Sequence, residues 1–437
     1  MADHATSSDP AVQAQLDRLA QASLPRDVLG FDRIRALLAK LGNPERALPP
    51  VFHVAGTNGK GSTCAFLRAM LEAAGHKVHV FTSPHLVRFN ERIRVAGRLI
   101  EDAPLAELLG EVITAGEGIE PSFFEVATAA ALLAFARTPS DACILEVGLG
   151  GRLDATNVIE RPLVTAIADL GLDHQDFLGN RLIDIAGEKA GIAKTGVPLV
   201  TQNYRPNILK RIAEIAAAVG APLKARGDDW QVRVRGERLR YRDSLGALDL
   251  PLPGLHGRHQ ARNASLAVAM LRHQQEVAVP TEAMAEGIRA VRWPGRLQLL
   301  GPGPLTARLP GRRVWLDGGH NRGGAMAISA EMARHAPFDL IFALTSTRWV
   351  RDVLGPFAPL VRKAHTIPLY GHPHHDPRDI AMVAQAGLGP RETYPAFTLD
   401  SAIERLANDP EGRPDILIFG SLYLAGDVLA ANDQLPD

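Results

Sequence analysis

The sequence predicts an α/β protein with two sheets, and three observations indicate this fold class. Short apolar runs alternate with segments of helical spacing along most of the 437 residues, which is typical of parallel sheets with right-handed crossovers. A glycine turn joins an apolar strand to a helix at residues 53–62. The stretch QVRVRGERLRYRD at residues 231–243 instead alternates apolar and polar residues, so it predicts an antiparallel insert over residues 231–252.

The individual elements divide into two groups around a composition change at residues 293–304, WPGRLQLLGPGP. Before this junction we expect strands at residues 51–54, 77–81, 142–147, 163–168 and 197–201, and helices at residues 62–74, 123–137, 183–193, 207–219 and from 262 onward. After it, the four apolar runs VWLDGG, LIFALT, HTIPLY and DILIFG predict further strands. We therefore predict a large P-loop-type domain with a mainly parallel sheet at residues 1–298. A smaller Rossmann-like α/β domain is predicted at residues 299–437.

Composition and charge narrow the functional class. The 48 basic and 48 acidic residues cancel, which favours neither a nucleic-acid partner nor a charged membrane surface. The longest apolar stretch, near residues 126–136, is too short to span a bilayer and predicts a buried helix. The only cysteines are Cys64 and Cys143, so we expect a reducing, cytoplasmic compartment. Nothing indicates an obligate interface, and we expect a monomer.

The glycine turn HVAGTNGKGS, residues 53–62, has the features of an anion site. Glycines let backbone N–H groups close on phosphate oxygens, and the helix N-terminus favours negative charge. Lys60 adds a positive charge, and Ser62 or Thr63 can reach a magnesium ion. The match to GxxxxGK[ST] is imperfect, because Val54 occupies the first glycine position and Gly61 follows the lysine. A purely structural turn is the alternative.

Further polar residues follow other predicted strands, where ligands of open α/β sheets collect. Glu146 ends an apolar strand and is followed by glycines, which fits either a metal site or a structural turn. His174 taken alone is more often a packed or capping residue than a ligand. Lys189 lies in an apolar helical segment, where a buried lysine needs a partner or a modification. The segment FTSPHLVRFNERI, residues 81–93, supplies polar residues that a solvated loop would also explain; these are Ser83, His85, Arg88, Asn90, Glu91 and Arg92.

These motifs occur in one order with PSFFEVAT, LEVGLGGRLDATN, EKAG, HQARNA, WPGR, DGGHN and GSLYLAGDVL. Over residues 30–430 the series resembles the bacterial bifunctional folylpolyglutamate synthase/dihydrofolate synthase family of the Mur-ligase superfamily. The resemblance implies ATP-dependent addition of L-glutamate to dihydropteroate, giving dihydrofolate, and to reduced folates, through an acyl phosphate. Two alternatives stay open: a folylpolyglutamate synthase without the dihydropteroate step, and a P-loop regulatory NTPase.

The resemblance also implies roles for individual residues. The ATP phosphates would be held by Thr57, Asn58, Gly59, Lys60, Gly61 and Ser62, with further nucleotide contacts from Asn263, Arg296 and Asp317. Two magnesium ions would be held with the help of Ser83, Glu146 and His174. Pterin contacts would come from Ser122, Phe123, Phe124, Glu125, Leu153, Asp154 and Ala155. Lys189 would be carbamylated, and Lys60, His174 and Lys189 would be the catalytic residues.

The sequence departs from the family pattern in two places. Arg322 follows DGGHN where the family usually has proline. The stretch at residues 344–352, LTSTRWVRD, lacks the usual GML…KD pattern, and Arg348, Arg351 and Asp352 are the candidates to replace its lysine and aspartate. Both departures fall in the predicted C-terminal domain.

Overall fold

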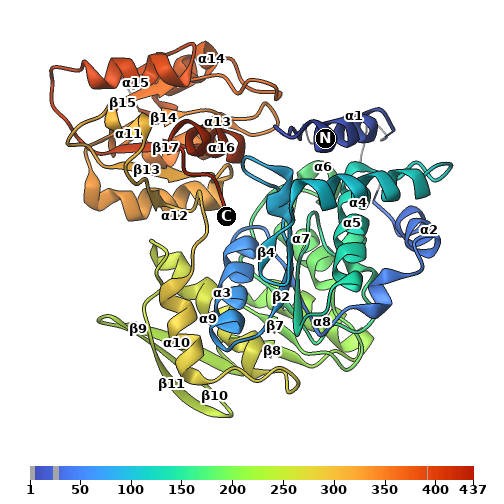
Figure 1. The fold of residues 1–437 in the computed structure, drawn as a ribbon. Helices are drawn as coiled ribbons and strands as arrows, with labels where there is room; N and C mark the ends of the chain where they lie inside the picture. Colours follow the sequence, from blue (N-terminus) through green and yellow to red (C-terminus); the bar gives the residue numbers. More distant parts are fainter. Residues whose placement is uncertain (1–4, 23–28, 391) are drawn as a thin grey trace. The chain divides into compact units, whose positions relative to one another are not determined.

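The computed structural model describes residues 5–22, 29–390 and 392–437. It divides into two compact units (Figure 1). The first contains Met1–Gly254, Gln260–Arg292 and Asp437, and the second contains Leu255–His259 and Trp293–Pro436. The predicted domain division between residues 298 and 299 stays a prediction about functional domains.

The first unit is built on an eight-stranded sheet in the order β4-β3-β2-β5-β1-β6-β7-β8. Its strands are β1 (Val51–Ala55), β2 (Val78–Phe81), β3 (Ile93–Val95), β4 (Arg98–Leu99), β5 (Ala142–Glu146), β6 (Val164–Ile167), β7 (Leu199–Thr201) and β8 (Leu223–Ala225). Strands β2, β5, β1, β6, β7 and β8 pair in parallel, whereas β3 pairs antiparallel with both β2 and β4. The prediction of a mainly parallel first sheet is confirmed.

Helices of the first unit cover both faces of this sheet, with α3, α9 and α10 on one side and α4 and α5 on the other (Figure 1). Their bounds are α1 (Pro10–Ala22), α2 (Asp32–Lys40), α3 (Lys60–Ala73), α4 (Asp102–Ala115), α5 (Phe123–Arg137), α6 (Gln175–Leu178), α7 (Leu182–Ala190), α8 (Pro206–Val219), α9 (Arg258–Arg272) and α10 (Thr281–Ala290). Helix α5 has the predicted bounds and is buried along most of its length, as its apolar sequence indicates. In the described part of the chain, no helix combines the length and apolar character needed to cross a membrane.

The predicted antiparallel insert is confirmed as a three-stranded sheet in the order β11-β10-β9. Its strands are β9 (Trp230–Arg235), β10 (Arg238–Asp243) and β11 (Gly246–Pro251). The buried rings of Trp230 and Tyr241 stack with their centroids 5.8 Å apart. Arg272 of α9 donates two 2.5 Å hydrogen bonds to the Asp243 carboxylate. These contacts fix the insert on the helix that follows it.

The second unit has a six-stranded sheet in the order β12-β13-β17-β14-β15-β16, in which only β12 and β13 pair antiparallel. The strands are β12 (Gln298–Leu299), β13 (Val314–Asp317), β14 (Phe338–Phe342), β15 (Val361–Thr366), β16 (Thr393–Pro395) and β17 (Ile416–Phe419). The helices are α11 (Pro304–Ala307), α12 (Arg322–Met332), α13 (Val350–Leu354), α14 (Pro377–Val383), α15 (Leu399–Ala407) and α16 (Leu422–Ala431). The predicted smaller α/β sheet is thus confirmed.

Several element boundaries predicted from the sequence are wrong, among them the end of the helix predicted at residues 183–193, which ends at Ala190, and the start of the helix predicted from residue 262, which begins at Arg258. Two further differences have a clear local cause. HTIPLY was expected to form a strand at residues 365–370, but β15 ends at Thr366, because Pro368 lacks the N–H that a paired strand requires. The helix after the glycine turn begins at Lys60 and not at Ser62. Gly59 has φ of 81°, a conformation that glycine adopts at little cost, so the turn ends one residue earlier than the glycine at position 61 suggests.

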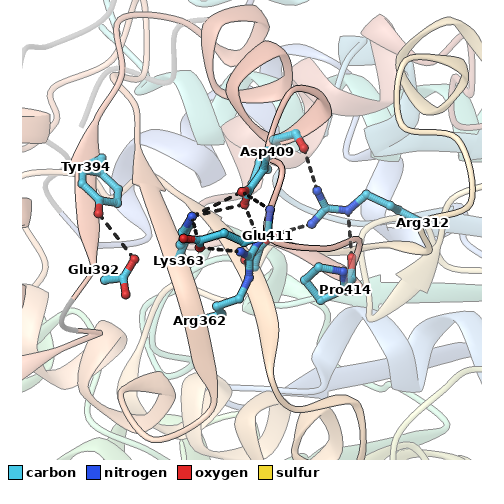
Figure 2. Close-up of polar contacts among 10 residues, drawn as sticks. Arg312, Arg362, Lys363, Glu392, Tyr394, Asp409, Glu411 and Pro414 are labelled. Atoms are coloured by element: carbon cyan, nitrogen blue, oxygen red, sulfur yellow. Dashed lines mark hydrogen bonds and ion pairs between the residues drawn. The ribbon is translucent and has the colours of Figure 1, made fainter.

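A network of ion pairs joins the amino ends of the strands in the second unit. Arg362 and Lys363 at the start of β15 point toward Asp409 and Glu411 in the segment before β17 (Figure 2). Arg362 Nη2 lies 2.6 Å from Asp409 Oδ2, and Lys363 Nζ lies 2.5 Å from Glu411 Oε2. The Asp339 carboxylate in β14 is fully buried and pairs with both Arg312 and Arg362. Because ligands of such sheets bind at the carboxyl ends of strands, this network has a structural role.

Asp339→Asn is expected to lower the free energy of unfolding by about 3–5 kcal/mol, because it removes the carboxylate that pairs with the buried Arg312 guanidinium. The Arg312 side chain is 2% exposed and the Arg362 side chain 18% exposed. The matched control is Glu411→Gln. The Glu411 side chain is 63% exposed, so this substitution should lower the free energy of unfolding by less than about 1 kcal/mol. Urea denaturation measures both variants. Equal effects would contradict the assignment of Asp339 as the centre of the network.

Candidate active site

Sheet order alone brings four sequence motifs together. Strands β2, β5, β1 and β6 are consecutive neighbours and run parallel, so their carboxyl ends meet at one edge. Ser83 follows β2, Glu146 ends β5, the glycine turn follows β1, and His174 follows β6. The predicted phosphate and metal residues of the first unit therefore belong to adjacent loops.

The glycine turn is held in shape by close backbone contacts. A Cβ on Gly56 would lie only 2.8 Å from Ala168 Cβ, so this position has no room for a side chain. The N–H groups of Thr57 and Asn58 donate to the Asp169 carbonyl at 2.8 and 3.2 Å. The turn leads directly into α3, whose first N–H groups are those of a helix N-terminus. This arrangement suits phosphate oxygens.

Lys60 and Asn263 both lie at this turn. Lys60 Nζ is 3.5 Å from the Thr57 carbonyl oxygen, so its ammonium stays at the mouth of the loop. Asn263 of α9 is 6% exposed, and a Cβ on Gly59 would lie 2.4 Å from its Oδ1. The structure thus places a predicted nucleotide contact against the glycine turn, although Asn263 and Gly59 are far apart in the sequence.

The other two predicted nucleotide contacts belong to the second unit. Asp317 ends β13, and its Oδ2 accepts a 2.8 Å hydrogen bond from the N–H of Leu297, the residue after Arg296. Its Oδ1 accepts from the Gly319 N–H at 2.7 Å. The WPGR and DGGHN motifs are therefore joined within this unit, while the nucleotide contacts of Arg296 and Asp317 stay predictions.

The predicted metal residues form a set rich in oxygen. The Ser83 N–H donates to Glu146 Oε2 at 3.2 Å, and Glu146 is 4% exposed. His174 takes a left-handed conformation with φ of 50°, and its Nε2 lies 3.7 Å from Asp173 Oδ1. Over residues 5–22, 29–390 and 392–437, no group of three His, Cys, Asp or Glu side chains is placed to hold a metal ion. The donor set fits magnesium, which is commonly held by one or two carboxylates together with substrate phosphates.

The two predicted halves of the pterin site adjoin each other. A Cβ on Gly148 would lie 2.3 Å from Phe124 Cζ, so the glycine segment after β5 packs closely against the far end of this ring. Phe123 contacts Phe89 edge-on, with the ring centroids 5.9 Å apart. Both Phe123 and Phe124 are half-buried, which leaves aromatic area for a flat ligand.

Several other predicted pterin residues use their side chains within the chain itself. Ser122 and Glu125 form a capping box at the start of α5, and Glu125 also pairs with Arg33 at 3.0 Å. Asp154 accepts hydrogen bonds from the Leu149 N–H at 2.8 Å and from Thr156. Burial raises the pKa of Asp154, while these hydrogen bonds oppose the rise. Contacts of these residues with a pterin stay predictions, together with those of Leu153 and Ala155.

Lys189 is 4% exposed, and Ile185, Ala186 and Ala190 around it are also buried. Burial, followed by the nearby charge of Lys60, lowers the pKa of Lys189 to about 7. Its Nζ lies 3.5 Å from the Gly150 carbonyl. The prediction of a buried lysine is confirmed by this environment, and a large fraction of its amine is neutral near pH 7.

Two contacts at the site were not predicted from the sequence, although Arg92 was named among the polar residues of its segment. Arg92 is 1% exposed and donates from Nε to His85 Nδ1 at 2.8 Å. Its guanidinium carbon lies 5.5 Å from the Phe89 ring centroid and 5.4 Å from that of Phe123. An aromatic residue three positions before an arginine was the available signal. No sequence signal marks Asp169, because its backbone carbonyl makes the contact.

The two departures from the family pattern have simple local structures. Arg322 is the first residue of α12, and Asn321 caps this helix by accepting from the Gly324 N–H at 2.9 Å. Proline is favoured at a first helical position but is not required there. In the 344–352 segment, the Arg348 carbonyl accepts a 2.7 Å hydrogen bond from His375 Nε2. The ligand roles of Arg348, Arg351 and Asp352 stay open.

Comparison with known proteins identifies the family. Residues 54–271 match the family model of the Mur ligase middle domain. The chain is 34% identical to the dihydrofolate synthase/folylpolyglutamate synthase of Bacillus subtilis, over 91% of this chain and 94% of the relative. The structure resembles Escherichia coli FolC in complex with DHPP and ADP, with a TM-score of 0.85, 31% identity and 97% of each chain covered.

A second solved structure is similar to the same extent. It is the bifunctional folylpolyglutamate synthase/dihydrofolate synthase from Yersinia pestis complexed with AMPPNP and Mn ion. Its TM-score is 0.85, with 29% identity over 97% of this chain and 99% of that chain. The fold and these comparisons thus define an ATP-dependent ligase of the Mur-ligase type. Within that class, the chain belongs to the dihydrofolate synthase/folylpolyglutamate synthase family.

Proposed function

We propose that this protein adds L-glutamate to dihydropteroate, giving dihydrofolate, and to reduced folates, giving folylpolyglutamates, with ATP as the source of activation. One observation carries the proposal. The phosphate loop, the Ser83–Glu146 pair and the half-buried Phe124 ring all lie at the carboxyl ends of neighbouring strands of one sheet. Family membership supports the same activity.

An amide bond between a carboxylate and an amine requires a leaving group on the carboxylate. Transfer of the γ-phosphoryl group of ATP gives an acyl phosphate, the amine of L-glutamate attacks its carbonyl carbon, and inorganic phosphate leaves. Negative charge builds up on the phosphoryl oxygens, so preorganised positive groups accelerate the transfer. The loop N–H groups and the Lys60 ammonium supply this charge, while Phe123 and Phe124 hold the pterin ring.

Ser83, Glu146 and His174 would hold magnesium at this edge of the sheet. Bound magnesium supplies neutralisation of the nucleotide phosphates. We propose two ions, and the second requires a further anion near Lys189. The neutral Lys189 amine reacts with carbon dioxide to give a carbamate and a proton. The modification thus places an anion where a protonated lysine would be a buried cation. The pKa of about 7 for Lys189 supports this modification.

Glu146→Gln is expected to raise the magnesium concentration needed for half-maximal rate by roughly 10–100-fold, as for other losses at metal sites. The substitution keeps the size of the side chain and removes its charge. The control is Glu111→Gln, which removes a carboxylate that is 44% exposed and paired with Arg137. Rates measured across a magnesium titration decide the role. A lower rate with an unchanged magnesium dependence would remove Glu146 from the metal site.

Release of phosphate from ATP tests the proposed reaction class. A ligase of this kind releases phosphate only when the pterin substrate and L-glutamate are both present. A regulatory NTPase turns over ATP without either of them, and this outcome would overturn the proposal. Activity with tetrahydrofolate but not with dihydropteroate would assign the folylpolyglutamate synthase activity alone.

We also propose that the enzyme works as a monomer in the cytoplasm. Cys64 and Cys143 are both free and buried, which supports a reducing compartment. Size-exclusion chromatography coupled to light scattering measures the oligomeric state directly.

A further inference from the structure

A chain of buried polar side chains connects the strand before the phosphate loop with the glycine segment after β5. His53 Nε2 lies 2.9 Å from Thr156 Oγ1, and Thr156 Oγ1 lies 2.5 Å from Asp154 Oδ1. The second oxygen of Asp154 accepts the Leu149 N–H at 2.8 Å. His53 and Thr156 are fully buried, and Asp154 is 1% exposed. None of the functions described above uses His53 or Thr156.

The direction of every hydrogen bond in this chain follows from its members. The Thr156 hydroxyl donates to Asp154 Oδ1, so its single proton is already used and its oxygen accepts from His53. Burial, and then the charge of Lys194, lower the pKa of His53 to about 3, so its ring is neutral and carries its proton on Nε2. Each hydrogen bond in this series therefore points toward the Asp154 carboxylate, and the protons of the series have a single arrangement.

Asp154 holds the segment at residues 148–151, and this segment contacts both Phe124 and Lys189. Gly148, directly before Leu149, lies against the Phe124 ring. Gly151, three residues before Asp154, packs on Lys189, where an added Cβ would lie 3.0 Å from Lys189 Cα. A shift of residues 148–151 would therefore move the surface that supports Phe124 and the surface that encloses Lys189.

A role in core packing alone does not account for His53. The residue lies in the central strand β1 between β5 and β6, where an apolar side chain would be buried at no polar cost. His53 Nδ1 has no hydrogen-bond partner among the described residues, and a buried polar atom without a partner is costly. In the part of the chain that the structure describes, the side-chain hydrogen bond of this ring is the one from Nε2 to Thr156, and it favours a histidine here.

We propose that His53 is a positioning residue for the pterin site, and that it acts through Thr156 and Asp154 on the segment at residues 148–151. The inference rests on the proposed function, since the site it positions is the proposed pterin site. His53 is three residues before Gly56 of the glycine turn. The strand that leads into the glycine turn therefore also orients the segment at residues 148–151.

Thr156→Val tests the chain, because it removes the hydroxyl and keeps the shape of the side chain. Breaking one buried hydrogen bond of this kind is expected to raise the KM for dihydropteroate by roughly tenfold, while the KM for ATP changes by less than about twofold. Thr156→Ser keeps the hydroxyl and should stay close to wild type in both constants. Thermal unfolding of both variants reports any general loss of structure.

His53→Gln and His53→Leu form a second matched pair. Glutamine can present an N–H at the position of the imidazole Nε2, so it should retain the dihydropteroate KM that leucine loses. This pair decides the question if Thr156→Val does not fold. The double variant His53→Leu/Thr156→Val should be no worse in KM than the worse single variant, because both changes break the same chain.

The outcomes separate this inference from the proposed function. If wild-type protein ligates glutamate and Thr156→Val raises the KM for ATP as much as that for dihydropteroate, the chain has only a general structural role and the inference fails. Equal constants for the valine and serine variants would overturn it as well. If the wild-type protein does not ligate glutamate, the proposed function fails instead.

Discussion

Lys60→Ala is expected to lower turnover by roughly 10²–10³-fold, by analogy with the loss of one preorganised donor to a developing oxyanion. The Lys60 ammonium lies at the mouth of the glycine turn, 3.5 Å from the Thr57 carbonyl. Alanine is the best helix former, so the start of α3 should be retained. Steady-state rates of glutamate ligation at saturating ATP measure the effect.

The matched control is Lys210→Ala, which removes an exposed lysine from α8. This variant should ligate glutamate at the wild-type rate. Circular dichroism of both variants verifies that they are folded. Near wild-type turnover in folded Lys60→Ala would contradict the assignment of the glycine turn as the phosphate site.

Lys189→Ala is expected to lower turnover on the order of 10²-fold, comparable to other losses beside a metal site. Acetate or formate should restore part of the rate, because a small carboxylate can occupy the vacated space as an anion. Lys189→Arg should not be rescued, since arginine retains a positive charge. If Lys189→Ala and Lys189→Arg lose turnover equally and neither acetate nor formate restores it, the result would contradict a carbamate at this position.

The carbamate itself has a spectroscopic test. Protein equilibrated with ¹³C-bicarbonate should show a carbamate carbon signal that Lys189→Ala abolishes and Lys194→Ala retains. Lys194 is the appropriate control because burial also lowers its pKa. Only the neutral amine reacts, and the pKa of Lys189 is about 7 against an ordinary 10.5. The signal and the turnover should therefore fall together as the pH drops through 7.

Patterns along the chain predicted those parts of the fold that depend on local sequence. Helix α5 has the bounds that its uninterrupted apolar run indicates, from Phe123 to Arg137. The antiparallel insert follows from strict alternation and was also predicted. The short strands β3, β4, β8, β12 and β16 were not predicted, because two or three residues carry no periodicity. The end of β15 was misplaced because apolar character outweighed Pro368 in the prediction.

The candidate site was predictable only as a set of residues. The glycine turn, Ser83 and Glu146 were expected at strand ends, and the observed order of β2, β5, β1 and β6 makes them neighbours. The internal use of Asp154 could not be predicted, since a carboxylate in a glycine-rich segment has the same sequence whether it contacts a ligand or the backbone. The contact between Asn263 and Gly59 arises from tertiary packing of α9, for which the sequence holds no local signal.

Identification of the products by mass tests the central claim most directly. Protein, ATP, magnesium and L-glutamate are incubated either with dihydropteroate or with tetrahydrofolate. We expect dihydrofolate from the first substrate and a tetrahydrofolate with at least one added glutamyl residue from the second, each accompanied by one phosphate per amide bond. Hydrolysis of ATP without any glutamylated product in either incubation would contradict the account.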